Sequence, residues 1–118
     1  LPPPPPPLGE PGAAGAPGAP GTALAYAHIN ADGTLDAANS KGVTPANVTH
    51  PIAGTYCIAG LATAPKNVVA NLGLNGTAFT QVSDLGAVLG CGPGTQVAIA
   101  TFDGVGADAD NDLWVALN

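Results

Sequence analysis

Glycine recurs at every third position near the start of this chain. The repeated glycines are Gly9, Gly12, Gly15, Gly18 and Gly21, and alanine, proline and one glutamate fill the four Gly-X-Y triplets. Collagen triple helices have this period because only glycine fits at the crowded axis of three chains. The alternative is a flexible or semi-rigid Gly/Ala/Pro linker. We favour a collagen-like stem, although four triplets are too few to hold three chains together unaided.

The stem also contains an unbroken proline run at residues 2–7. Proline fixes φ and has no backbone N–H, so such a run forms a stiff polyproline II rod. Because this stretch is too rich in proline and glycine to pack a core, we divide the chain into a stem, residues 1–21, and a head, residues 22–118. The head is long enough for a β-sandwich.

The charge balance excludes several classes of partner. Lys41 and Lys66 are the only basic side chains beside eight acids, and the net charge is −6. Binding to a phosphate backbone or to an anionic membrane surface needs clustered cations. No apolar run reaches the roughly 18 residues needed to span a bilayer. We therefore expect no nucleic-acid partner and no membrane insertion.

The apolar residues are mostly small. Hydrophobic residues make up 46% of the chain, but only one Trp, two Tyr and two Phe supply large side chains. Such a core is thin, and oligomerisation or a covalent staple would strengthen it. Cys57 and Cys91 are the only cysteines, and neither has the neighbouring His or Cys of a zinc site. We interpret them as a disulfide formed in an oxidising compartment, with free thiols or an intermolecular bridge as alternatives.

The hydrophobic period changes from three to two after the stem. Alternating apolar residues and turn signals predict strands over residues 24–29, 34–40, 46–50, 55–61, 67–72, 79–82, 95–103 and 112–118. Asp32-Gly33 and Asn75-Gly76 are turn dipeptides, and Pro51 is expected to stop the third strand. The last two strands are expected to form a hairpin around an acidic loop. The pattern favours an all-β fold, an antiparallel sandwich of seven or eight strands with jelly-roll-like or Greek-key connections.

Four segments together resemble a known kind of domain. They are residues 27–34, 54–58, 97–102 and 113–117, the last reading Leu-Trp-Val-Ala-Leu. Over residues 23–118 the order of strands and turns is similar to the C-terminal β-sandwich of phage tail-fibre-like proteins and to heads that follow collagen-like repeats in bacterial proteins. The resemblance implies a homotrimeric head that ends a fibre and contacts a glycan or protein receptor, on a cell surface or a virion. It brings no catalytic signature.

The acidic loop is the most suggestive candidate for a metal site. Asp103, Asp108, Asp110 and Asp112 alternate with small residues, and alternating carboxylates can direct oxygen ligands at Ca²⁺. The spacing of the last three matches the start of an EF-hand, but the required glycine and glutamate do not follow. We therefore weigh a calcium site against a solvated turn that keeps an edge soluble, and favour the turn.

The remaining candidates carry weaker signals. His28 and His50 are the only imidazoles, and we interpret them as strand histidines, with a metal ligand or a ring of three at a trimer axis as the alternative. Ser40 and Ser83 lack a nucleophile-elbow sequence, so we expect no enzyme. Trp114 is expected in the core or a trimer interface, with a receptor-facing role as the alternative. Asn47 and Asn75 begin glycosylation sequons, a common tripeptide.

These patterns predict a structural and interaction protein that is secreted or displayed on a surface. A collagen-like stem would hold three heads side by side, so that weak single-site contacts add to useful avidity. The alternative is a monomeric small-ligand or Ca²⁺-binding module on a rigid spacer, with no other cofactor.

Overall fold

The computed structural model describes residues 23–82 and 90–118, so the stem glycines and Ser83 lie outside the described residues. The described part contains eight strands and one short helix. They are β1 (Ala25–Ile29), β2 (Leu35–Lys41), the 3-10 helix η1 (Pro45–Asn47), β3 (Val48–Ile52), β4 (Thr55–Ala59), β5 (Val68–Leu72), β6 (Thr77–Val82), β7 (Thr95–Phe102) and β8 (Leu113–Leu117). In these residues no helix has the length and apolar character needed to cross a membrane.

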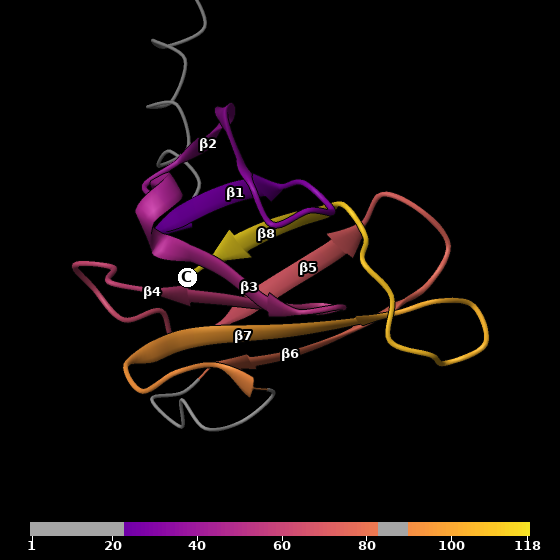
Figure 1. The fold of residues 1–118 in the computed structure, drawn as a ribbon. Helices are drawn as coiled ribbons and strands as arrows, with labels where there is room; N and C mark the ends of the chain where they lie inside the picture. Colours follow the sequence, from indigo (N-terminus) through magenta and orange to yellow (C-terminus); the bar gives the residue numbers. More distant parts are fainter. Residues whose placement is uncertain (1–22, 83–89) are drawn as a thin grey trace, which may run out of the picture.

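The strands form two four-stranded antiparallel sheets that face each other (Figure 1). One sheet has the order β2-β1-β8-β5 and the other the order β3-β4-β7-β6. In each sheet the two central strands come from opposite halves of the chain, since β8 pairs with β1 and β7 pairs with β4. The prediction of an all-β antiparallel sandwich is confirmed.

The core lies between the sheets, and every second residue of the central strands contributes to it. Alternate residues of the central strands point inward, as successive side chains of a strand face opposite sides of its sheet. The inward residues are Ala25, Ala27 and Ile29 of β1, Leu113, Val115 and Leu117 of β8, Tyr56 and Ile58 of β4, and Val97 and Ile99 of β7. Tyr56 is the largest fully buried side chain.

A disulfide lies on the outer face of the β3-β4-β7-β6 sheet. Cys57 of β4 and Cys91, which precedes β7, are bonded, with Cα atoms 5.8 Å apart and a sequence separation of 34. They form a small buried cluster with Ala98. The predicted disulfide is confirmed, and it is intrachain. It supplies the covalent staple that a core built largely of small side chains favours.

Two expectations were wrong, one about which strands pair and one about where a strand ends. β7 and β8 do not form a hairpin, because β7 pairs with β4 and β6 whereas β8 pairs with β1 and β5 in the other sheet. Alternation fixes the buried face of a strand but not its partner. β3 also continues through Pro51 to Ile52. β3 is an edge strand whose register shifts between Thr49 and Ile52, and proline is tolerated in such places.

Candidate functional site

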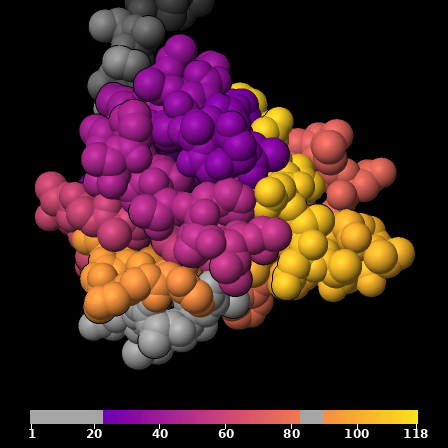
Figure 2. Space-filling view, in the orientation of Figure 1, coloured from indigo at the N-terminus to yellow at the C-terminus, as the bar shows by residue number. Residues whose placement is uncertain are grey.

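Four connections gather at one end of the sandwich, on the right in Figure 1. They are the loop at residues 30–34, the turn at residues 53–54, the turn at residues 73–76 and the loop at residues 103–112. We call this set the loop end. Figure 2 shows residues 73–76, in salmon, and the gold part of the 103–112 loop projecting from it. Two of the most exposed large apolar side chains lie here, Leu74 at 75% and Val105 at 90% exposure.

Asn111 and Asp112 join the 103–112 loop to two other connections of the loop end. The Asp112 carboxylate accepts a hydrogen bond from the backbone N–H of Ala31 at 2.9 Å. The side-chain oxygen of the buried Asn111 accepts one from the N–H of Leu74 at 3.1 Å. The two residues therefore hold the β1–β2 loop and the β5–β6 turn, so loop conformation is fixed by partners far away in the sequence.

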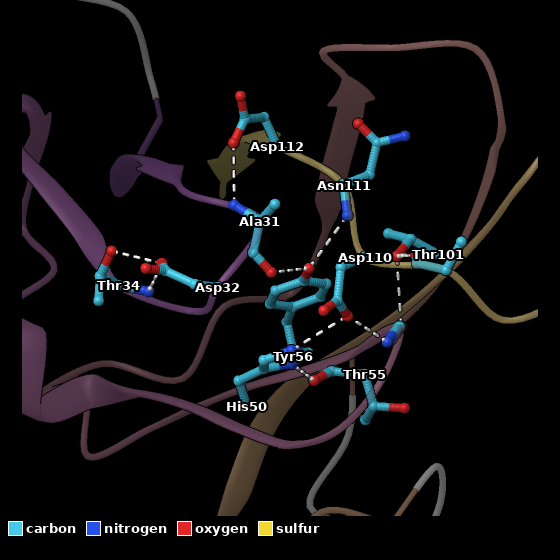
Figure 3. Close-up of polar contacts among 12 residues, drawn as sticks. Ala31, Asp32, Thr34, His50, Thr55, Tyr56, Thr101, Asp110, Asn111 and Asp112 are labelled. Atoms are coloured by element: carbon cyan, nitrogen blue, oxygen red, sulfur yellow. Dashed lines mark hydrogen bonds and ion pairs between the residues drawn. The ribbon is translucent and has the colours of Figure 1, made fainter.

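Asp110 binds the third neighbour, the β3–β4 turn (Figure 3). One oxygen of its carboxylate accepts the N–H of Gly54 at 2.7 Å and lies 3.0 Å from Nε2 of His50. Nδ1 of His50 lies 2.6 Å from the backbone oxygen of Thr55. Both ring nitrogens of His50 thus lie within hydrogen-bond distance of oxygen atoms.

Tyr56 occupies the centre of these contacts (Figure 3). Its hydroxyl donates to the backbone oxygen of Ala31 at 2.7 Å and accepts the N–H of Asn111 at 3.1 Å. Burial raises the pKa of the Tyr56 phenol, because desolvation disfavours the phenolate. The ring stacks on His50 with centroids 4.5 Å apart. A polar tip on a core residue therefore connects three segments of the chain.

The carboxylates predicted as calcium ligands have separate partners. Asp103 accepts hydrogen bonds from the N–H groups of Val105 and Ala107 at 2.9 and 3.0 Å, which closes its own loop. Asp110 and Asp112 bind different loops, and Asp108 is exposed. Among residues 23–82 and 90–118 no group of three or more His, Cys, Asp or Glu side chains is placed to hold a metal ion. Calcium binding stays a prediction.

Asp32 has a local role in the β1–β2 loop. Its carboxylate accepts hydrogen bonds from the backbone N–H and the hydroxyl of Thr34. The hydroxyl of Thr34, and then its N–H, lower the pKa of Asp32 because they stabilise the ionised carboxylate. The predicted Asp-Gly turn is confirmed, with Gly33 at a φ of 89°.

His28, Asp36 and Ser40 lie together without forming a catalytic triad. Nδ1 of His28 is 2.9 Å from the Asp36 carboxylate, but the Ser40 hydroxyl bonds to backbone groups. It accepts the N–H of His28 and donates to the backbone oxygen of Asp36. Hydrogen bonds from Asn39 and then from His28 lower the pKa of Asp36. The hydroxyl is thus oriented by the β1–β2 pairing and not by an imidazole base.

The outer face of the β2-β1-β8-β5 sheet exposes aromatic side chains, and we call it the aromatic face. Tyr26, Val69 and Trp114 are 48%, 50% and 46% exposed. His28 stacks on Trp114, with ring centroids 3.8 Å apart and planes inclined by 4°. Trp114 therefore does not belong to the core, because the neighbouring leucine and valine residues of β8 take the inward positions.

The two sequon asparagines differ in their environment. The Asn47 side chain accepts hydrogen bonds from the N–H and hydroxyl of Thr44 and donates to the backbone oxygen of Ala59. It is therefore part of the η1–β4 contact. Asn75 is exposed in the turn between β5 and β6, whereas Asn47 is half-buried.

Sequence reasoning missed the central role of Tyr56 and Asn111. The strand pattern around Tyr56 identified a buried face, but a buried tyrosine needs a partner for its hydroxyl, and that requirement was the available signal. Asn111 lies between Asp110 and Asp112, and the acidic pattern there gave no separate signal for an asparagine. Comparison of the chain with models of protein families, with curated proteins and with solved structures gave no match. Function is therefore inferred from the fold and these contacts.

Proposed function

We propose that this protein is a structural and interaction module: an extracellular β-sandwich head, carried as a homotrimer on a Gly-X-Y stem, that attaches to a surface receptor through its loop end. The Cys57–Cys91 disulfide supports an oxidising location such as the cell exterior. The four Gly-X-Y triplets support a threefold stem. The proposed role is non-catalytic.

The observation that carries the proposal is the direction of the strands. The described chain enters the sandwich at one end, where Ala25 lies opposite Leu117. The loop end lies at the other ends of the same strands, beyond the pairing of Ile29 with Leu113. A head on a stem would thus hold its loop end outward, away from the stem.

The loop end has the construction expected of a contact surface. Hydrogen bonds from the Asp110–Asp112 segment hold three neighbouring connections in place, so little ordering entropy remains to be lost on binding. Leu74 and Val105 present apolar side chains from this rigid frame. Three such ends on one trimer would add avidity to a weak single contact.

The solution mass tests the proposal directly. Light scattering on the full chain and on residues 22–118 is expected to give three times the chain mass for both. A trimer only in the full chain would make the stem the organiser and still support a trimeric head. A monomer in both would contradict the proposed function, because the avidity that it relies on would be absent.

A further inference from the structure

The aromatic face contains a hollow of about 180 Å³. Its floor is Ala116 of β8, which pairs with Tyr26 of β1 on one side and Val69 of β5 on the other. Because the middle residue is small and its neighbours are large, the flanking side chains stand as two walls. Trp114 and Asn71 line the hollow beside them. The space is smaller than the roughly 300 Å³ at which ligand pockets begin, so it suits one compact apolar group.

Three of the residues that line the hollow, Tyr26, Asn71 and Trp114, carry side-chain hydrogen-bond donors. The Tyr26 hydroxyl, the Trp114 indole N–H and the Asn71 amide make no hydrogen bond to any residue that the structure describes. The described lining contains no charged side chain, although the chain carries a net charge of −6. A matching ligand is therefore uncharged, compact and apolar, and supplies acceptors.

The chain itself contains a segment with these properties. Residues 1–8 read Leu, six prolines and Leu, with no charged side chain. A proline run offers apolar rings and backbone carbonyl acceptors but no N–H donors. Proline-rich segments bind aromatic-lined grooves because the polyproline II conformation is already formed and little entropy is lost.

The dimensions of rod and hollow agree. One turn of polyproline II is three residues long and rises about 9.3 Å. The walls of the hollow, Tyr26 and Val69, stand two strands apart, which is about 9.5 Å at the usual strand spacing. A rod crossing the strands would thus seat one ring on Ala116 while its carbonyls face the donors on either side.

We propose that this hollow binds the proline run, residues 2–7, of another copy of the chain, so that heads link neighbouring molecules. In the extended stem of the proposed function, residues 9–21 at about 3.1 Å per residue would place a head's own run about 40 Å away, so another copy is required. This choice between own and neighbouring chain rests on the extended stem of the proposed function. Binding of the segment does not, and it applies equally to a monomer.

Fluorescence of Trp114, the only tryptophan, provides the test. A synthetic peptide of residues 1–8 is titrated into the full chain carrying Pro3→Ser, Pro4→Ser and Pro6→Ser, which disrupt the competing run. We expect a saturable change with a Kd of about 0.1–1 mM, as befits a contact that buries little surface. A Gly/Ser peptide of equal length is expected to give no change. No saturable change with the proline peptide would overturn the proposal.

Substitutions in the hollow separate specific docking from general stickiness. In the same background Ala116→Leu fills the hollow and Tyr26→Ala removes a wall, and each is expected to weaken peptide binding at least tenfold. Phe79→Ala changes a similarly exposed aromatic on the outer face of the other sheet and is expected to leave it unchanged. Circular dichroism verifies that each variant is folded. Equal binding by all three variants would contradict the assignment.

Association of the full chain tests the intermolecular form. Its mass is expected to rise with concentration above the basal oligomer, and the triple Pro→Ser variant is expected to keep a constant mass. Growth that persists in the variant would mean that the molecules associate through another surface, and would overturn linkage by the proline run. Peptide binding with no growth of the full chain would overturn the linking of separate molecules. The basal mass reports on the trimer separately.

Discussion

The imidazole of His50 and the phenol of Tyr56 lie face to face, with ring centroids 4.5 Å apart and planes inclined by 7°. The stack brings the polar atoms of both rings to one segment, since Nε2 of His50 meets Asp110 and the Tyr56 hydroxyl meets the N–H of Asn111. A strand on the sandwich edge and a strand in its centre thus hold the same connection between the sheets.

Removal of the Tyr56 hydroxyl is expected to weaken the whole domain. Tyr56→Phe leaves the backbone oxygen of Ala31 and the N–H of Asn111 without this partner. An unsatisfied buried polar group costs about 1–3 kcal/mol, so we expect the free energy of unfolding in urea to fall by about that amount. Tyr26→Phe is the matched control, because Tyr26 is exposed, and should change it by less than about 0.5 kcal/mol. Equal effects would show that the hydroxyl contacts do not stabilise the fold.

The same hydroxyl predicts a loss of stability at alkaline pH. Burial raises the pKa of Tyr56, so the folded state favours the neutral phenol. The stabilisation is complete below the unfolded pKa of about 10 and is lost as the pH rises above it, since the unfolded chain releases the proton more readily. Urea unfolding at several pH values from neutral to strongly alkaline is expected to show this decline. Tyr56→Phe should decline less, and parallel curves for the two proteins would contradict the assignment.

Two glycines with nearly equal φ separate backbone strain from steric overlap. Gly33 has φ +89° and a Cβ there would overlap the Cβ of His50, whereas Gly106 has φ +87° and open space. Gly106→Ala pays only for the left-handed conformation, about 1–2 kcal/mol. Gly33→Ala is expected to cost about 1–3 kcal/mol more, as does overpacking of a core. Thermal and urea unfolding of both variants measure the difference, and equal costs would mean that the His50 contact yields freely.

The sequence predicted the strands better than their partners. The apolar positions of Ala25 to Ile29 and of Leu113 to Leu117 alternate correctly, because burial on one face imposes a period of two. The predicted hairpin of β7 and β8 was wrong. Residues 103–112 contain the same turn signals whether they join two neighbouring strands of one sheet or cross from one sheet to the other. Which strands pair depends on packing between the sheets, and a local stretch of sequence does not contain that information.

The sequence likewise predicted some contacts at and near the candidate site and missed others. The pairing of Cys57 with Cys91 followed from cysteine count and context. The partners of Asp110 and Asp112 did not, because their carboxylates bind N–H groups of Gly54 and Ala31, which are distant in the sequence. A carboxylate that fixes a loop and one that binds a cation have the same local spacing, and only tertiary structure distinguishes them.

The disulfide is expected to contribute strongly to a core of small side chains. Cys57 and Cys91 enclose a segment with a sequence separation of 34, and the chain-entropy account gives about 4 kcal/mol for a loop of that size. Cys57→Ala with Cys91→Ala is expected to lower the free energy of unfolding by about this amount. Reduction and alkylation of the unmodified chain should give the same loss. A loss below about 1 kcal/mol would show that the reduced chain is already constrained.

Calcium is expected to leave the melting temperature unchanged. A cation would have to compete with the N–H groups that Asp103, Asp110 and Asp112 already bind, and these carboxylates point at different segments. A ligand that binds only the folded state raises its stability by about 2.7 kcal/mol at one hundred times its Kd, so a site filled at millimolar Ca²⁺ would be visible. The comparison is between melting in EDTA and in millimolar Ca²⁺, with Mg²⁺ as the control for ionic strength. A rise specific to Ca²⁺ that disappears in Asp108→Asn would establish the calcium loop, and with it the small-ligand module as the better description of the head.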